Sequence, residues 1–417
     1  MTLWEDLHRA RGGNGFELIE RSIRWANHEE YKTHLVTGLI GSGKSTELNR
    51  LMGALQTKRD EKLFHVTYLD ANEYLDSTEI GLPDLLTAFL PALVADPILN
   101  MPKSAAAQDM WRNVRQWVRA VGQDVAEDIV SGTKGLRVLL KSLPGFQRRF
   151  RDRTETHITG LFDHLRSVIN EIRKSLLAEG VDDLVIVIDN LEKIHFRIIE
   201  ADVSSNTHEV FFLNQLPPIQ QLPVHMVLSF PLSVYLSVAR IRNLYPNSEI
   251  AMIPMVRVRD RHTKQDDEIG LAALRALVAR RVDVARVFAS EEVLRSILCA
   301  SGGCPRDILR VISQAALRKG ELPLDQQTID AVLREQNASF ERVLQGRPYL
   351  QQLHHIERTG SFPSGFSNED RIRLLEELIV VEYNGETWYD VHPFVRDTRA
   401  YQGARGDGAT DRISGSE

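Results

Sequence analysis

The sequence predicts an α/β fold: a parallel sheet covered by helices on both faces and interrupted by a helical insertion, followed by an all-helical unit and a winged helix-turn-helix. Three observations support this prediction. Continuous apolar runs, such as residues 184–188 and 224–228, are typical of strands buried on both faces of a parallel sheet. Helical patterns separate these runs along the chain. Near the C-terminus, three helical patterns precede two β-rich runs around Asn384-Gly385, a strong hairpin signal.

The composition is that of a globular protein with two or three domains. The chain has 417 residues, 43% of them hydrophobic, with 51 Lys and Arg against 57 Asp and Glu, which gives a formal charge of −6. This balance argues against a non-specific nucleic-acid packager but leaves room for a local basic groove. The only cysteines, Cys299 and Cys304, exclude a disulfide framework and a zinc site made of thiolates.

The sequence also predicts a cytoplasmic protein. No apolar stretch approaches the roughly 20 residues that span a bilayer. Residues 1–13 carry four charged side chains and no apolar segment, so we expect no signal peptide. Cysteine usage fits a reducing compartment.

Residues 1–262 are predicted to form the α/β core. The segment at about 102–180 is mostly helical and too long for an ordinary connection between strands, so we interpret it as an insertion. The expected strands of this core are residues 34–37, 63–69, 184–188, 224–228 and 250–253, and the expected helices outside the insertion are 17–29 and 82–94.

Two smaller units are expected after the core, and then a tail. Residues 263–322 are predicted to form a helical lid, residues 323–400 a winged helix-turn-helix, and residues 401–417, rich in Gly, Asp and Ser, a disordered tail. The expected lid helices are 268–282, 290–300 and 307–318; the winged helix should contain helices 326–344, 349–357 and 368–378 and strands 379–383 and 387–391.

The most specific motif is a glycine-rich loop between a predicted strand and a predicted helix. Residues 38–45 read GLIGSGKS, a full match to G-x-x-x-x-G-K-[ST]. Glycines allow backbone N–H groups to turn toward a phosphate, and the helix that follows adds its positive N-terminal end. Lys44 should reach the β- and γ-phosphates, and the Ser45 hydroxyl should coordinate Mg²⁺. The residues expected to bind nucleotide are Gly38, Gly41, Ser42, Gly43, Lys44, Ser45 and Thr46.

A second element offers the carboxylates that hydrolysis requires. The apolar run 184–188 ends at Asp189, which should hold Mg²⁺ through its water shell at the carboxyl end of the strand. Glu192 is the candidate general base, although it and Lys193 equally suit a solvent-facing pair. Asn190, the next residue, is not an acid and is expected at most to orient water.

With these motifs the chain resembles AAA+/STAND-type P-loop ATPases, of the branch that includes initiator-like ATPases with an added winged helix. The resemblance extends over about residues 15–399 and includes residues 376–393, which look like the wing of bacterial ATPases with this layout. It implies a P-loop NTPase three-layer α/β/α sandwich that binds ATP and Mg²⁺ and hydrolyses ATP. It also matches Ser229 to a polar sensor near the γ-phosphate and Arg306 to a second sensor on the lid.

Several roles stay open at this point. Asp189-Asn190 replaces the Asp-Glu pair usual in AAA+ enzymes, which leaves the rate of hydrolysis undecided. Ser229 also suits a simple strand-end hydroxyl, and Arg306 a lid-surface arginine with a local ion pair. Cys304, beside Arg306, is a redox-sensor candidate, but a small buried thiol is the commoner outcome for such a residue. No motif assigns an arginine finger; the candidates are Arg240, Arg242 and Arg197.

Two uses of the ATPase compete. The first is a nucleotide-driven switch, since relatives usually act as oligomers and bacterial ones often serve in defence or signalling through a protein partner. The alternative is a DNA-binding ATPase. Against DNA, the predicted recognition helix 368–378 has four acids and only two bases. The basic residues that would favour DNA are Arg112, Arg115, Arg119, Lys134, Arg137, Lys141, Arg148, Arg149, Arg151 and Arg153 in the insertion, and Arg257, Arg259, Arg261, His262 and Lys264 later in the chain.

Overall fold

The computed structural model describes seven stretches of the chain: residues 4–13, 15–75, 80–95, 158–199, 202–344, 349–383 and 387–403. The described residues form two compact units. Unit 1 takes its residues from 1–14, 38–46 and 252–417, and unit 2 takes its residues from 15–37 and 47–251.

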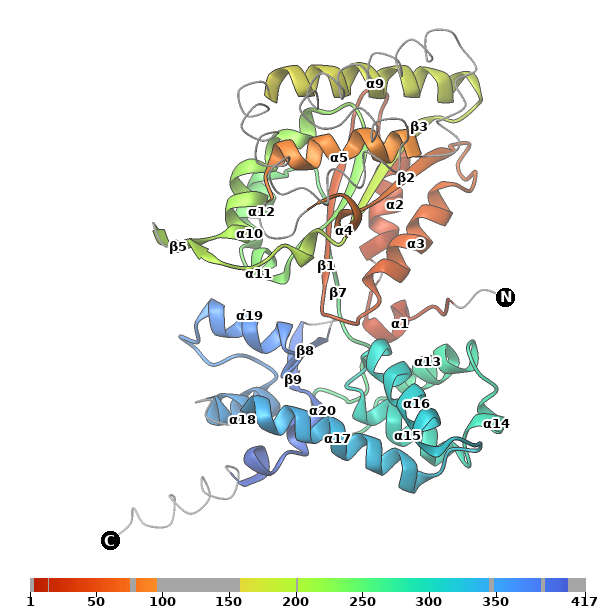
Figure 1. Cartoon of the computed structure of the whole chain (residues 1–417), viewed down its shortest axis with the longest axis vertical. Helices are drawn as coiled ribbons and strands as arrows, with labels where there is room; N and C mark the ends of the chain where they lie inside the picture. Colours follow the sequence, from red (N-terminus) through yellow and green to blue (C-terminus); the bar gives the residue numbers. More distant parts are fainter. Residues whose placement is uncertain are drawn as a thin grey trace, which may run out of the picture. The chain divides into compact units, whose positions relative to one another are not determined.

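A five-stranded sheet forms the centre of the α/β core, and its strand order is β2-β3-β6-β1-β7 (Figure 1). The pairs β2 with β3, β3 with β6 and β6 with β1 are all parallel. In β3, Leu184, Ile186 and Ile188 join the main apolar cluster, while Val185 and Val187 are equally buried on the other face. Both faces are therefore covered, as the apolar runs predicted. The strands are β1 (Thr33–Gly38), β2 (Phe64–Asp70), β3 (Asp183–Asp189), β6 (His225–Ser229) and β7 (Ile250–Ile253).

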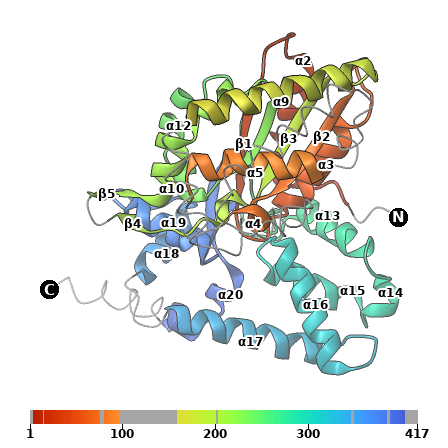
Figure 2. The same cartoon turned by 45° about the horizontal axis from the view of Figure 1, so that its top comes forward.

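The helices of the core lie in two layers. The connection from β1 to β2 and the connection from β2 to β3 run in opposite directions along the sheet. Because such crossovers are right-handed, they place α3 (Lys44–Leu55) on one face and α5 (Leu82–Ala95) with α9 (Ile158–Ala178) on the other (Figures 1 and 2). On the face of α3, the Arg24 guanidinium of α2 (Gly15–Trp25) donates to carbonyls at the end of α3 and just after it. The predicted three-layer α/β/α sandwich is thus confirmed.

Part of the predicted insertion lies outside the described residues. This applies to residues 96–157 and so to the basic residues between Arg112 and Arg153, whereas the last part of the insertion forms α9. Between β3 and β7 the structure adds elements that the sequence did not predict. They are η2 (Leu191–Lys193), β4 (Ile198–Ile199), β5 (Asp202–Asn206), α10 (Thr207–Glu209), η3 (Val210–Gln215), η4 (Pro217–Gln221), α11 (Leu232–Tyr235) and α12 (Val238–Leu244), while α4 (Ala71–Tyr74) follows β2.

Unit 1 is mainly helical and has its own apolar cluster. The short N-terminal helix α1 (His8–Arg11) belongs to it, because Leu7 and Ala10 pack in the cluster that also contains Leu274 and Ile297. Backbone N–H groups at the starts of helices are capped by side chains such as Asp267. The lid helices are α13 (Glu268–Ala279), α14 (Val284–Val287), α15 (Glu291–Ala300) and α16 (Pro305–Lys319).

The C-terminal part of unit 1 has the elements predicted for a winged helix. Three helices precede an antiparallel pair in which Val380 lies opposite Val391, and residues 384–386 between the strands lie outside the described part. Residues 404–417 of the predicted tail also lie outside it. The elements are α17 (Gln326–Leu344), α18 (Leu350–Thr359), α19 (Asn368–Glu376), β8 (Val380–Tyr383), β9 (Trp388–Val391) and α20 (Pro393–Arg396).

No helix in the described stretches is both long and apolar enough to cross a membrane.

The buried carboxyl of Glu382 in β8 gives the stability a pH dependence. Its side chain is 2% exposed, and burial raises its pKa from 4.5 to about 7. The folded state therefore binds this proton more strongly, and its contribution to stability falls as the pH rises from about 4.5 to about 7.

We expect Glu382→Gln to remove this dependence. In denaturant unfolding, the free energy of unfolding of the parent should fall relative to that of the variant as the pH rises from 4.5 to 8, by on the order of 2 kcal/mol. Glu369→Gln, at an exposed site on α19, is the matched control. A constant difference between parent and Glu382→Gln across this range would contradict the prediction.

Candidate functional site

The glycine-rich loop follows directly after β1 and has the backbone geometry that its sequence motif predicts. Gly41 and Gly43 have φ values of +83° and +99°, in the left-handed region that favours glycine. A Cβ atom at Gly41 would also lie 2.7 Å from the Cys304 sulfur. Helix α3 begins at Lys44, so the loop opens onto a helix N-terminus.

Three consecutive carbonyl groups of this loop are held by other parts of unit 1. The Cys304 thiol lies 3.8 Å from the Ile40 carbonyl, and the Arg306 N–H donates to the Gly41 carbonyl at 3.4 Å. The Arg11 guanidinium donates to the Ser42 carbonyl. In a planar trans peptide the next N–H points the opposite way. The Gly41 N–H is therefore directed away from Cys304, and the Gly43 N–H is directed away from Arg11.

The residues that follow the loop suit a phosphate group. Lys44, Ser45 and Thr46 form the first turn of α3, and the last two are exposed. Ser42 is fully buried, and its N–H donates to the Leu39 carbonyl within the loop. A helix N-terminus, inward N–H groups and a lysine together make an anion-binding site.

The structure places Arg306 beside the loop. Arg306 is the second residue of α16, its side chain is exposed, and its Cβ lies 2.9 Å from where a Cβ of Gly41 would be. Cys304, next to it, is fully buried, and burial raises the pKa of its thiol to about 12. Such a thiol is unreactive near neutral pH, in agreement with the small buried thiol considered from the sequence.

In unit 2, Asp189 is a buried carboxylate held in a fixed orientation. It is fully buried at the end of β3, where its Oδ1 accepts the Asn190 N–H at 2.8 Å. Its Oδ2 accepts the Tyr68 hydroxyl at 3.3 Å. Burial, and then the charges of Asp189 and Asp70, raise the pKa of Tyr68, so this hydroxyl remains a donor.

Tyr68 and Asp70 were not among the residues predicted for this site. Asp70 ends β2 and lies in register beside Asp189 at the end of β3. The Asn190 side chain donates to Asp70 at 2.8 Å, so this acid fixes the orientation of the amide. The available signal was that Asp70, like Asp189, follows an apolar strand.

Ser229 supports the turn that follows Asp189. It ends β6, the strand between β1 and β3, and it is fully buried. Its Oγ accepts the Leu191 N–H at 2.9 Å. Leu191 begins the 3₁₀ turn that contains the partly buried Glu192. Ser229 therefore fixes the backbone on which Glu192 sits.

The acids of unit 2 suit a metal that is bound mainly by other ligands. Within the described stretches, no group of three His, Cys, Asp or Glu side chains is arranged to hold a metal by itself. Magnesium commonly takes one or two protein oxygens and completes its shell with phosphates and water. Asp189 of unit 2 offers one carboxylate of this kind. Ser45 of unit 1, exposed at the start of α3, offers a hydroxyl.

The three candidate arginine fingers are all exposed. Arg240 and Arg242 lie on α12, and Arg197 lies just before β4.

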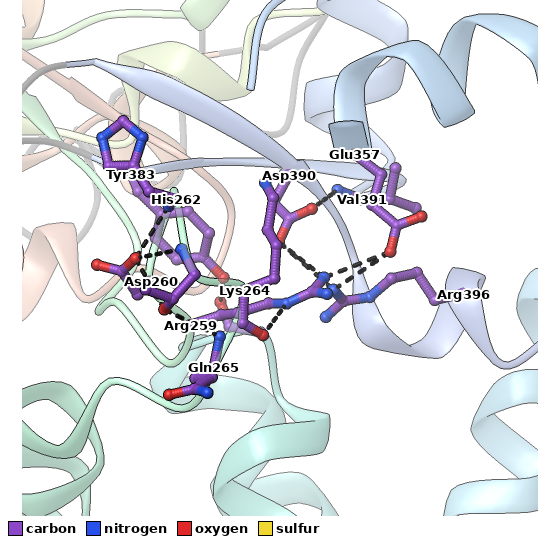
Figure 3. A network of polar contacts seen from close by, with 12 residues as sticks. Arg259, Asp260, His262, Lys264, Gln265, Glu357, Tyr383, Asp390, Val391 and Arg396 are labelled. Atoms are coloured by element: carbon purple, nitrogen blue, oxygen red, sulfur yellow. Dashed lines mark hydrogen bonds and ion pairs between the residues drawn. The ribbon is translucent and has the colours of Figure 1, made fainter. Parts of the chain in front are cut away.

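Two arginines of the second basic run, which follows β7, form ion pairs with acids of unit 1. Arg259 pairs with Glu357 at 3.3 Å and with Asp390 at 3.6 Å. Arg396 approaches the same two acids, and Figure 3 shows both guanidinium groups directed toward them. Arg257 also pairs with an acid, Asp267, at 3.6 Å. Arg257 and Arg259 therefore bind protein carboxylates, which weakens the interpretation of the run as a stripe that follows nucleic-acid phosphates.

Comparison with known proteins gives likeness in structure only. No family model matches the sequence, and no curated protein matches it. The chain is similar to the ORC2 protein of Aeropyrum pernix, with 12% identity and a TM-score of 0.45 over 96% of this chain and 94% of that one. It is also similar to a Walker-type ATPase of Pyrococcus abyssi, with 14% identity and a TM-score of 0.44 over 91% and 93%.

We expect Ser229→Ala to destabilise the protein by about 1–3 kcal/mol, because the buried Leu191 N–H would lose its acceptor. Urea unfolding measures this change. The control is Ser175→Ala, whose exposed hydroxyl donates to a helix carbonyl, and it should leave the free energy of unfolding nearly unchanged. Equal stability of Ser229→Ala and the parent would contradict this role of the hydroxyl.

Proposed function

We propose that the chain is an ATPase that binds ATP with its glycine-rich loop and works as a nucleotide-driven switch. The observation that supports this proposal is the loop itself. Its left-handed glycines and outward carbonyl contacts direct the N–H groups of Gly41 and Gly43 to the opposite side, and Lys44 follows at the start of α3. This is the arrangement that phosphate groups require.

Each site residue receives a role in this proposal. The loop residues Gly38, Gly41, Ser42 and Gly43 surround the phosphates, and Lys44 neutralises their charge. Mg²⁺, when bound, would polarise the γ-phosphate, with Ser45 as its ligand and Asp189 holding its water shell. The remaining contacts are assigned to Thr46 at a phosphate and to Arg306, which is on the lid and beside Gly41.

Hydrolysis requires a base, and Glu192 is our candidate. Asp189 and the Ser229 contact to Leu191 fix the turn on which it sits. Tyr68 and Asp70 are polar neighbours of Asp189, and the Asn190 amide donates a hydrogen bond to Asp70. Position 190 carries no acid, and the carboxylate beside Asp189 is Asp70 of β2, which accepts from the Asn190 amide. We propose a slow turnover, as suits a switch.

The winged helix is joined to the loop by a short chain of contacts within unit 1. The Tyr383 hydroxyl of β8 donates to the Gly302 carbonyl at 2.8 Å, and His392 lies 3.7 Å from Asp307. The first contact restrains the turn before α16, and the second restrains the first turn of α16 itself. In that first turn, the Arg306 N–H donates to the Gly41 carbonyl. A change at the phosphates would thus reach the winged helix. This favours a switch that signals to a partner, which we propose to be a protein.

DNA binding is the second candidate function, and the charge of the winged helix weighs against it. Residues 323–400 contain 13 Asp and Glu and 8 Arg, with no Lys, so their formal charge is 8 − 13 = −5. The exposed Glu369 lies on α19, the helix expected to enter a groove. Such a surface is repelled by phosphates. Oligomerisation, with Arg197, Arg240 or Arg242 completing a neighbour's site, belongs to the proposed switch.

We expect Lys44→Ala to abolish tight ATP binding and Glu192→Gln to retain it while slowing hydrolysis at least about tenfold, because only the second variant keeps the phosphate contacts. Titration with a fluorescent ATP analogue and steady-state phosphate release measure the two effects. Normal turnover in Glu192→Gln would exclude Glu192 as the base.

The switch proposal predicts that double-stranded DNA at low salt leaves the rate of ATP hydrolysis within about twofold of its value without DNA. The rate should be compared at low and high salt with the same DNA. A strong stimulation that disappears as salt is added would contradict the protein-switch proposal and support the DNA-binding alternative.

A further inference from the structure

Arg11 is a buried arginine whose charged group lies against the glycine-rich loop. Its side chain is 3% exposed, and its Nη2 donates to the Ser42 carbonyl. The same nitrogen lies 3.6 Å from where a Cβ of Gly43 would be. A guanidinium keeps its charge in any protein setting, so this position puts a fixed positive charge beside the loop backbone.

The helix that contains Arg11 is anchored in the lid. Leu7 and Ala10 pack in the apolar cluster of unit 1, and the Ala10 carbonyl accepts the Arg257 N–H at 3.4 Å. Glu5, just before the helix, pairs with Arg280 at 2.8 Å. Arg11 therefore reaches the loop from a helix that is packed and hydrogen-bonded within unit 1.

We propose that Arg11 is a positioning residue for phosphate binding, a proposal that rests on the ATP-binding function above. By holding the Ser42 carbonyl, Arg11 fixes the peptide plane whose other side presents the Gly43 N–H. Its charge also raises the positive potential that phosphates meet at the loop. The effect is preorganisation: the loop has its binding conformation before nucleotide arrives.

The contacts of the neighbouring carbonyls explain why the Arg11 side chain is important for the Ser42–Gly43 peptide. The Ile40 and Gly41 carbonyls are held by residues at the start of α16, whereas the Ser42 carbonyl is held by Arg11. Gly43 has a left-handed φ of +99° and no side chain to restrain it. Without Arg11 the Ser42–Gly43 peptide would lose this restraint.

The test compares Arg11→Met, Arg11→Lys and the control Arg9→Met, which removes an exposed arginine from the same short helix. For Arg11→Met we expect the Kd for ATP to rise about tenfold while kcat at saturating ATP stays within about twofold, because the residue acts on binding. Arg11→Lys should recover part of the affinity, since an ammonium also donates to a carbonyl. Arg9→Met should match the parent.

Hydrogen exchange of the nucleotide-free protein gives a second readout. The peptide containing residues 38–46 should exchange faster in Arg11→Met than in the parent or Arg9→Met, while the cluster around α13 and α15 keeps its protection. Unchanged exchange and an unchanged Kd in Arg11→Met would overturn the proposal, as would a loss of protection throughout unit 1 without a change in Kd. If the parent itself binds no ATP, the proposed function fails, and the inference about Arg11 fails with it.

Discussion

The account depends on how the carbonyl groups of residues 40–42 are held. A phosphate-binding loop must direct its N–H groups inward, and partners for its carbonyls on the outer side favour this arrangement. Here Cys304, Arg306 and Arg11 provide those partners, from the start of α16 and from the N-terminal helix. Left-handed glycines alone permit this conformation; the contacts from α16 and α1 select it.

These contacts also give a physical basis for coupling. The turn before α16 is packed tightly: a Cβ at Gly303 would lie 1.7 Å from the Val256 carbonyl, so only glycine fits there. The C-terminal hairpin holds the same turn through Tyr383. In the proposed switch, a contact made or lost at the phosphates would act on this closely packed segment, and packed segments transmit displacement better than loose ones.

Local patterns in the sequence predicted the fold, the glycine-rich loop and the acid at the end of β3. A few consecutive residues are enough to recognise the apolar runs, the glycine-rich motif and the acid at the end of β3. The structure has those strands and that loop where they were expected. Tyr68, Asp70 and Arg11 were not found, because their partners are distant in sequence: Asp70 meets Asp189 only through strand register, and Arg11 meets Ser42 only through lid packing. Nor did any local pattern show that Arg259 pairs with Glu357.

The central claim is that the loop is a preformed site for a nucleotide triphosphate. Calorimetric titration of the full chain with ATP, with and without Mg²⁺, tests it most directly. We predict saturable binding at one site per chain, tighter for ATP than for AMP, because the loop recognises the terminal phosphates, and weakened when Mg²⁺ is withheld. Equal affinity for ATP and AMP, or no binding at millimolar ATP, would contradict the claim.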